Sequence, residues 1–409
     1  MKKTLLFIVA AIAIAVSISP AVMAQRPTIN PPPPPKAMPT PAAPSLGANS
    51  YILMDFNSGD VMVENDPDMR VEPASITKVM TSYVVFTELA AGNIQLTDLV
   101  NVSEKAWRTG GSRMFIEPGM EVTIEQLIKG MVIQSGNDAS VALAEHLAGT
   151  EEAFAGLMNH YAAQLGMGNS HFMNATGLPD EEHYTTARDV ALLSVALIAD
   201  FPDYYHWYSE KEYSFNDIRQ HNRNNLLWRD PAVDGLKTGH TEAAGYCLAS
   251  SAKRDGMRLI SVVLGSSSES SRVSESQSLL NYGFRFFETV QLYQAGQELA
   301  QGKVWKGEQD QVRLGIEYEL FVTIPRGHYD ELDAKVEMRP ELMAPLTSGE
   351  EVGRISIRIG DDEITSRGLI TLEAIAEDGF FGRSWDGMSM WFDGLFEDDE
   401  AEEDSKDDG

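Results

Sequence analysis

The chain has 409 residues, of which 43% are hydrophobic and 23% are charged. This length and apolar content suffice for one large core or two ordinary domains and exclude a disordered protein. The formal net charge of −29 excludes nucleic acid as a partner and implies that any anionic substrate is held by a local cationic pocket. The single cysteine, Cys247, excludes an internal disulfide, and we expect it to be a small buried residue.

Residues 1–24 have the layout of a cleaved secretory signal: two lysines, an apolar run of about fourteen residues, and small residues ending at Ala24. The apolar run is short for a membrane span, so we expect export with cleavage of this segment. Removing its two lysines changes the formal charge from −29 to −31. Residues 25–48 follow as a proline-rich tether that we expect to be extended and solvated rather than packed.

The first predicted elements of the folded chain are two strands and a helix. Residues 51–65 alternate as two strands joined by a polar turn. A helix is predicted over 73–86, because proline suits its first turn and apolar residues recur at helical spacing after it. Ser75 and Lys78 are three residues apart in this helix, so we expect their side chains to lie on one face.

Ser75 and Lys78 are a candidate nucleophile and base. A serine hydroxyl is a weak nucleophile unless a base lies within hydrogen-bond reach, and a neutral lysine in a shielded pocket is such a base. A lysine that acts near neutral pH needs its pKa lowered by about three units, or about 4 kcal/mol, through burial and a second nearby cation. The pair therefore predicts a second cation and an oxyanion hole elsewhere in the chain.

A second candidate site lies in a turn between two helices. Residues 94–122 are turn-rich and show no periodicity, and the apolar spacing after them predicts helices over 123–134, 138–149, 151–165 and 185–200. Ser135, Gly136 and Asn137 separate the first two of these helices. Such a polar turn presents side chains to a cleft, although a plain helix cap with a glycine stop fits the same residues.

The remaining segments predict an α+β protein with a second, all-β domain. Strands are predicted over 211–217, 233–253 and 257–265, and a helix over 271–289. After this helix, short alternating runs divided by glycine and proline predict a separate small all-β domain. We therefore expect a first domain over 49–288 and a second over 289–378.

A third motif lies in the strand before the last hairpin of the first domain. Lys237, Thr238 and Gly239 occur there, and the glycine lets a ligand backbone approach the strand edge closely. With the S-x-x-K of the first helix and the S-x-N of the interhelical turn, this K-T-G completes the ordered set of penicillin-recognising serine enzymes. Lys237 also supplies the second cation that the base requires.

Two decoys show that each motif alone is unspecific. Ser250 and Lys253 make another S-x-x-K, but they lie in a predicted strand, where a spacing of three sends the side chains to opposite faces. Ser214 and Asn216 likewise imitate the second motif within a strand. Only the set that begins at Ser75 combines a helix, an interhelical turn and a strand in that order.

The sequence resembles the low-molecular-mass penicillin-binding proteins that act as D-alanyl-D-alanine carboxypeptidases. The resemblance spans nearly the whole mature chain, through PASITKVMTSY, QSGNDA, RQHNRNNLLW, VDGLKTGHT, MRLISVV, GFRFFET and FVTIPRG. It implies the penicillin-binding and serine β-lactamase-like transpeptidase fold, an antiparallel sheet with helices on both faces, followed by the small all-β domain and a C-terminal amphipathic helix. It implies neither a cofactor nor a metal.

The resemblance also implies roles for the motif residues. Ser75 is acylated, Lys78 takes its proton, and Ser135 with Asn137 carries protons and holds the substrate amide. The backbone N–H groups of Ser75 and His240 form the oxyanion hole. The terminal carboxylate of the substrate is held by residues that match family positions at Lys237, Thr238, Arg223 and Arg272. For the two arginines, a surface or structural ion pair is the alternative.

The function that the resemblance implies is removal of the last D-alanine of a peptidoglycan pentapeptide, with β-lactams as inhibitors. A secreted β-lactamase shares the three motifs, but no E-x-x-L-N follows Ser135, and Glu181 and Glu182 are expected to face solvent. A cell-wall DD-endopeptidase resembles this chain without the all-β domain and the amphipathic end. A non-catalytic cell-wall binding protein would be expected to have lost a motif residue.

Residues 379–396 predict an amphipathic helix, followed by an acidic tail over 397–409. Its apolar stripe has steps of four, three, four and three, through Phe381, Trp385, Met388, Phe392 and Leu395. The segment is too short to span a bilayer, and the resemblance implies peripheral attachment to the outer face of the inner membrane, in the periplasm. Packing of this helix on the all-β domain is the alternative. Because its polar face is acidic, we expect membrane binding to be hydrophobic and weak.

Overall fold

The computed structural model describes residues 40–379. The predicted signal (1–24), the first part of the tether (25–39), the amphipathic segment (380–396) and the acidic tail (397–409) lie outside the described residues. Within residues 40–379, no helix combines the length and the apolar character that crossing a membrane requires.

The last residues of the tether pack against helix α9 (Glu269–Phe286), so the expectation of a wholly solvated tether is wrong for this part. The hydroxyl of Tyr282 donates a hydrogen bond to the carbonyl of Pro41 at 2.8 Å, and the N–H of Gly47 donates to Glu275 at 3.0 Å. Proline lacks an N–H, but its carbonyl still accepts hydrogen bonds, and α9 supplies the donor.

A five-stranded antiparallel sheet organises the first part of the chain, in the order β2-β1-β9-β8-β7. Alternate residues of β1 enter two different cores: Ile52 and Met54 lie in one, and Leu53 lies in the other. Both faces of the sheet are therefore buried. The strands are β1 (Ser50–Asp55), β2 (Val61–Asn65), β7 (Val233–Thr241), β8 (Gly245–Arg254) and β9 (Met257–Ser266).

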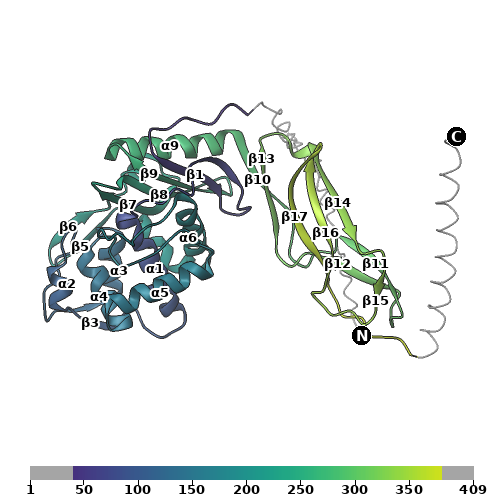
Figure 1. Ribbon diagram of the computed structural model, residues 1–409, viewed down its shortest axis with the longest axis horizontal. Helices are drawn as coiled ribbons and strands as arrows, with labels where there is room; N and C mark the ends of the chain where they lie inside the picture. The colour runs from purple at the N-terminus through teal and green to yellow at the C-terminus, as the bar shows by residue number, and fades with distance from the viewer. Residues whose placement is uncertain (1–39, 380–409) are drawn as a thin grey trace, which may run out of the picture. The chain divides into compact units, whose positions relative to one another are not determined.

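Helices cover both faces of this sheet, as predicted (Figure 1). Helix α9 packs on β8 and β9 on one face, and α6 packs on β1 and β9 on the other. Helix α1 is buried along most of its length and contacts α3, α4, α5 and α6. These helices are α1 (Thr77–Ala90), α3 (Ile124–Val132), α4 (Asn137–Ala148), α5 (Glu151–Gln164) and α6 (Ala187–Asp200).

The helix starts follow the local sequence. Helix α3 begins at a capping box, in which the side chains of Thr123 and Gln126 each bond the backbone N–H of the other residue. Helix α6 begins after Thr186, whose hydroxyl accepts from the N–H of Asp189. Both caps agree with the predicted starts.

Several short elements complete this part of the chain. The segment 94–122 contains two strands and a helix of three to five residues each, too short to show a periodicity in the sequence. Strand β3 pairs with β4, and β5 pairs with β6. The short elements are η1 (Ala74–Ile76), β3 (Leu99–Asn101), α2 (Glu104–Arg108), β4 (Glu121–Thr123), α7 (Pro202–Tyr205), η2 (His206–Ser209), β5 (Glu212–Phe215), β6 (Ile218–His221) and α8 (Leu226–Arg229).

The described residues after α9 form strands and one 3₁₀ turn. One sheet pairs β10 with β13, and a second has the order β14-β16-β17-β12-β11-β15. Buried residues alternate with more exposed ones along β12 and β13, as the sequence pattern predicts. The elements are β10 (Phe287–Tyr293), β11 (Ala300–Trp305), β12 (Gln311–Gly315), β13 (Leu320–Pro325), η3 (Tyr329–Glu331), β14 (Leu332–Met338), β15 (Leu342–Met343), β16 (Glu351–Ile359) and β17 (Asp362–Thr371).

The predicted helix over 271–289 ends three residues too late. Helix α9 stops at Phe286, and residues 287–289 instead belong to β10, where they pair with residues 323–325 of β13. Pairing with a strand more than thirty residues away overrides the helical pattern, which local sequence cannot reveal.

Candidate active site

Ser75 lies on a tight turn immediately before α1 and not within the helix itself. It is the middle residue of the 3₁₀ turn η1, and Ala74 before it has a φ of +46°. Two glycines allow neighbouring backbone to pack against this turn. A Cβ on Gly177 would lie 1.7 Å from the carbonyl oxygen of Ala74, and one on Gly239 would lie 3.0 Å from that of Pro73. The nucleophile is therefore held by contacts from β7 and from the segment before α6.

Lys78 lies in the first turn of α1 and is completely buried. Its Nζ is 3.1 Å from Oγ of Ser75, 2.7 Å from Oδ1 of Asn137 and 2.5 Å from the carbonyl oxygen of Thr176. Burial lowers the pKa of Lys78 to about 7, against the opposing charges of Asp138 and Glu151. Near neutral pH a large fraction of this amine is therefore unprotonated and able to accept a proton from Ser75.

The second motif lies where α3 ends and α4 begins. Ser135 has a φ of +67°, and Asn137 is the first residue of α4. The amide of Asn137 donates to the carbonyl of Gly110 at 2.6 Å, which leaves its oxygen facing Lys78. The plain helix cap does not describe this turn, because both side chains bond to catalytic candidates.

Asp138 follows Asn137 and anchors the loop that borders the cleft. Its buried carboxylate accepts hydrogen bonds from the N–H groups of Met114, Phe115 and Ile116, at 2.9 to 3.3 Å. The N–H of Asn137 donates to the carbonyl of Ser112 at 2.7 Å. The loop over 110–116 is thus fixed against the start of α4.

The third motif lies on β7, the edge strand of the sheet. Lys237 is buried, and its Nζ is 2.9 Å from Oγ of Ser135. Burial, followed by the charges of Lys78, Arg272 and Arg223, lowers the pKa of Lys237 well below its ordinary value. The ring of His240 stacks on Tyr246 of β8, with 4.0 Å between the ring centroids.

A cleft of about 190 Å³ joins these motifs. Seven predicted site residues line it, and the other three, Lys78, Asn137 and Lys237, reach them through the hydrogen bonds above. The lining comprises Ser75, Ser112, Ser135, Arg223, Thr238, Gly239, His240, Glu269 and Arg272. All ten residues singled out in the sequence therefore lie at one site. A larger cavity of about 570 Å³ lies near Arg254 and Arg326, but no serine–lysine pair lines it.

The two predicted arginines are both at the cleft but differ in burial. Arg272 is 3% exposed and donates to the carbonyl of Gly239 at 3.2 Å and to Glu269 at 3.3 Å. Arg223 is exposed, and its Nη2 is 3.4 Å from Oγ of Ser112. Arg272 is thus partly committed to an ion pair, whereas Arg223 faces the cleft mouth.

Three contributors were not predicted from the sequence. Ser112 and Glu269 line the cleft, and the carbonyl of Thr176 contacts Lys78. Ser112 lies in the turn-rich segment without periodicity, and Thr176 acts through its backbone, so neither had a side-chain signal. Glu269 could have been noticed as the acidic residue three positions before Arg272.

The decoy motifs behave as expected. Ser250 is fully buried in β8 and bonds the carbonyl of Ser261 at 3.4 Å, whereas Lys253 of the same strand is exposed. Cys247 is buried, which raises the pKa of its thiol to about 11. Ser214 and Asn216 lie in or beside β5, and neither lines the cleft.

The site can be compared with known proteins. The family described as D-alanyl-D-alanine carboxypeptidase (peptidase S11) matches residues 37–268, and the family described as penicillin-binding protein 5, C-terminal domain, matches residues 287–377. The chain is 46% identical over 360 residues to D-alanyl-D-alanine carboxypeptidase DacA of Escherichia coli (strain K12), which covers 86% of this chain and 89% of that protein.

Further similarity is found in a second relative and in a solved structure. D-alanyl-D-alanine carboxypeptidase DacC of the same bacterium is 47% identical over 366 residues, which covers 87% of this chain and 92% of DacC. Penicillin binding protein 5 from Haemophilus influenzae has a crystal structure that matches with a TM-score of 0.81 at 42% identity. That match covers 82% of this chain and 99% of the other.

Proposed function

Since the chain belongs to the peptidase S11 family of D-alanyl-D-alanine carboxypeptidases, we propose that it removes the terminal D-alanine of peptidoglycan pentapeptides through an acyl-enzyme on Ser75. The observation that carries this proposal is the distance of 3.1 Å between Oγ of Ser75 and Nζ of Lys78. Because burial lowers the pKa of Lys78 to about 7, this amine meets the requirement for activating a serine near neutral pH.

In the acylation step, neutral Lys78 accepts the proton of Ser75 as Oγ attacks the carbonyl carbon of the penultimate D-alanine. The backbone N–H groups of Ser75 and His240 stabilise the negative charge that develops on the carbonyl oxygen. The peptide bond then breaks, and the terminal D-alanine leaves with a proton relayed through Ser135. An ester on Ser75 remains, which water hydrolyses to release the shortened peptide.

The free carboxylate of the substrate is bound by the cations around β7. Thr238, Arg223 and Arg272 line the cleft, and Lys237 reaches it through its bond to Ser135. A protein of net charge −29 repels anions at long range, so a local cationic cluster is needed to bind an acidic peptide end. Asn137 would hold the amide of the substrate.

Penicillins are proposed to inhibit the enzyme by acylating the same serine. The matching Haemophilus influenzae protein is itself called a penicillin binding protein, which supports this assignment. A β-lactam would leave a longer-lived ester on Ser75 than a peptide does.

A secreted β-lactamase is less well supported than a carboxypeptidase. Fast hydrolysis of a penicilloyl ester in such enzymes uses a glutamate that activates water. Glu181 and Glu182 are exposed, and Glu151 is bonded to Lys105 and to the N–H of Ala175. The DD-endopeptidase alternative would not call for the all-β part over 287–377.

The protein is proposed to act in the periplasm, attached to the outer face of the inner membrane through residues 380–396. The signal layout of residues 1–24 supports export, and the apolar stripe of 380–396 supports attachment. The proposed cleavage leaves a mature chain of formal charge −31.

One experiment tests the proposed reaction. The mature protein is incubated with a peptide ending in D-Ala-D-Ala, and free D-alanine is measured. A labelled penicillin is then added, and mass spectrometry identifies the modified peptide. Release of D-alanine that penicillin abolishes supports the proposal, whereas rapid turnover of penicillin without release of D-alanine would favour the β-lactamase.

A further inference from the structure

The shortest contact of the Lys78 amine is with a loop carbonyl and not with a motif side chain. Nζ lies 2.5 Å from the carbonyl oxygen of Thr176, compared with 2.7 Å to Asn137 and 3.1 Å to Ser75. Thr176 belongs to no helix or strand, and it is buried. Because no helix or strand fixes Thr176, other contacts must hold its carbonyl against Lys78.

The hydrogen-bond partners of Lys78 determine where its lone pair points. A neutral amine has two N–H groups and one lone pair. The carbonyl of Thr176 and the amide oxygen of Asn137 are acceptors only, so they take the two N–H groups. The lone pair is then directed at Ser75, whose hydroxyl is the remaining partner and the only one able to donate a proton.

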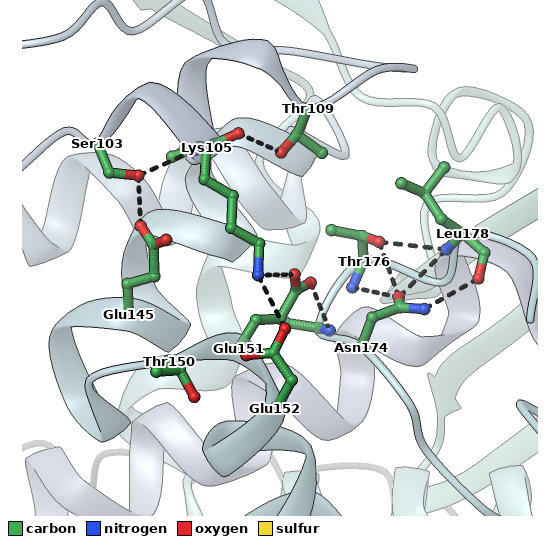
Figure 2. A network of polar contacts seen from close by, with 12 residues as sticks. Ser103, Lys105, Thr109, Glu145, Thr150, Glu151, Glu152, Asn174, Thr176 and Leu178 are labelled. Carbon is green, nitrogen blue, oxygen red and sulfur yellow. Dashed lines mark hydrogen bonds and ion pairs between the residues drawn. The ribbon is translucent and has the colours of Figure 1, made fainter.

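The side chain of Asn174 fixes the orientation of the Thr176 carbonyl. Its Oδ1 accepts from the N–H groups of Thr176, Gly177 and Leu178 at 3.1, 2.8 and 3.2 Å. Figure 2 shows its bonds to Thr176 and Leu178. The same oxygen accepts from the hydroxyl of Thr176 at 2.8 Å, and Nδ2 donates to the carbonyl of Leu178 at 3.0 Å. One side chain thus makes five hydrogen bonds to three residues, Thr176, Gly177 and Leu178.

The segment is also tied to helices on either side. The hydroxyl of Thr81 in α1 donates to the carbonyl of Ala175 at 2.8 Å, and the N–H of Ala175 donates to Glu151 of α5 at 3.2 Å. These contacts fix where the segment lies, whereas the contacts of Asn174 fix the orientation of the peptide units on either side of Thr176.

We propose that Asn174 is a positioning residue for the acylation step: by orienting the carbonyl of Thr176, it directs the lone pair of Lys78 at Oγ of Ser75. The proposal rests on the proposed function, in which neutral Lys78 is the base. Asn174 itself does not line the cleft, and its hydrogen bonds go to residues 176–178 and not to Ser75. Loss of the Asn174 side chain would leave Lys78 in the site, but its lone pair would no longer point at Oγ of Ser75.

The test compares two asparagines that bond the same stretch of chain. Asn159 of α5 bonds both backbone groups of Phe172, each at 2.8 Å, and it has no hydrogen bond to residues 174–178. Asn174→Ala and Asn159→Ala each remove an asparagine that anchors this stretch, but only the first disturbs the Thr176 carbonyl. Full-length mature protein is mixed rapidly with a labelled penicillin, and the concentration dependence separates reversible binding from the acylation rate constant.

The expected result is a loss of at least tenfold in the acylation rate constant of Asn174→Ala, with reversible binding within threefold of the wild type. Asn159→Ala should acylate within threefold of the wild type. Asn174→Asp keeps an oxygen that accepts the four bonds, so it should acylate faster than Asn174→Ala. If Asn174→Ala does not fold by thermal melting, Asn174→Thr, with its shorter hydroxyl, is measured in its place.

Two results would overturn the proposal: acylation of Asn174→Ala at the wild-type rate, or equal slowing by both alanine variants, which indicates general loosening of the segment. Lys78→Arg distinguishes these from failure of the underlying mechanism. If Lys78→Arg acylates normally, Lys78 is not the base, whatever the Asn174 variants show. If Lys78→Arg is inactive and Asn174→Ala is normal, only the positioning role is refuted.

Discussion

The amine of Lys237 lies 2.9 Å from the hydroxyl oxygen of Ser135, and both side chains are buried at the edge of the sheet. Lys237 also bonds the carbonyl of Thr238 at 3.1 Å, so these two contacts of the amine are with neutral oxygens. Burial and the neighbouring cations lower its pKa well below the ordinary value. Neither contact brings a negative charge to the Lys237 amine. An incoming carboxylate would bring one, and this is the physical basis for selecting substrates by charge.

We therefore predict that the enzyme distinguishes a peptide acid from its amide. Loss of a buried charged partner typically costs about 2 kcal/mol or more, or roughly thirtyfold, so kcat/KM should fall at least this much when the peptide's C-terminus is amidated. In Lys237→Gln the acid and the amide should be hydrolysed at similar, low rates. Lys253→Gln, at an exposed position of β8, is the control and should keep the discrimination. Equal turnover of acid and amide by the wild type would refute the assignment.

Labelling should select Ser75 over the decoy serine. Penicillin is expected to modify the peptide that contains Ser75, because the hydroxyl of Ser75 lies 3.1 Å from the buried amine of Lys78, whereas that of Ser250 bonds a backbone carbonyl. Ser75→Ala should abolish labelling and release of D-alanine. Ser250→Ala should leave both within a factor of three, since its buried hydroxyl bonds the carbonyl of Ser261 and does not line the cleft. Recovery of the label on a peptide from residues 245–255 would refute the prediction.

Acylation should depend on pH through Lys78. Its pKa is lowered to about 7, and only the neutral amine accepts a proton, so the rate constant should rise as pH increases through about 7 and then level off. Lys78→Arg keeps the charge but does not deprotonate, so acylation should fall by at least a hundredfold at every pH. Thermal melting over the same pH range controls for unfolding. Near-normal acylation by a folded Lys78→Arg variant would show that another group is the base.

Two adjacent glutamates provide a matched test of the charges that act on Lys78. Glu151 and Glu152 both pair with Lys105 (Figure 2), but only Glu151 contributes to raising the pKa of Lys78. Glu151→Gln keeps an oxygen for the N–H of Ala175 and removes the charge. Its acylation profile should therefore shift to lower pH.

The neighbouring substitution is the control for that shift. Glu152→Gln should leave the pH profile in place, because Glu152 is exposed and, unlike Glu151, is not one of the charges that raise the pKa of Lys78. A shift of the same size in both variants would mean that the loss of the Lys105 ion pairs, and not the charge of Glu151, moves the profile.

The sequence predicted which side chains form the site, but not the backbone geometry that positions them. Ser75, Lys78, Ser135 and Lys237 could be found because each motif requires a particular side chain at a fixed spacing, in a fixed order along the chain. The turn that carries Ser75 could not be found in this way. Its 3₁₀ geometry and the positive φ of Ala74 depend on close contact with Gly177, a hundred residues away.

The errors in the fold have similar long-range causes. Local pattern extended α9 over residues 287–289, where pairing with β13 makes a strand. The end of the tether was expected to be solvated, but Tyr282 of α9 holds the carbonyl of Pro41. The role of Thr176 was missed because a backbone carbonyl has no signature in the sequence.

The last prediction concerns attachment to a membrane, which rests on residues 380–396. In the predicted helix over this segment, five large apolar side chains would share one stripe, and full burial of each is worth roughly 1.5 to 3 kcal/mol. Its polar side has one arginine against two aspartates, and the following 13 residues, EDDEAEEDSKDDG, are strongly acidic. Anionic lipid should therefore repel this end, and salt should screen the repulsion.

We expect the mature protein to float weakly with vesicles that contain anionic lipid at low salt, and more strongly at high salt. A chain ending at Asp378 should not float at either salt concentration, because it lacks the apolar stripe. Replacing Trp385 and Phe392 with serine in the full mature chain should reduce flotation to the level of the truncated chain, while D-alanine release in solution stays unchanged. A basic interfacial helix would show the opposite salt dependence, since salt weakens its attraction to anionic lipid. Release of the mature protein by salt, or equal flotation of both chains, would therefore contradict hydrophobic attachment through this segment.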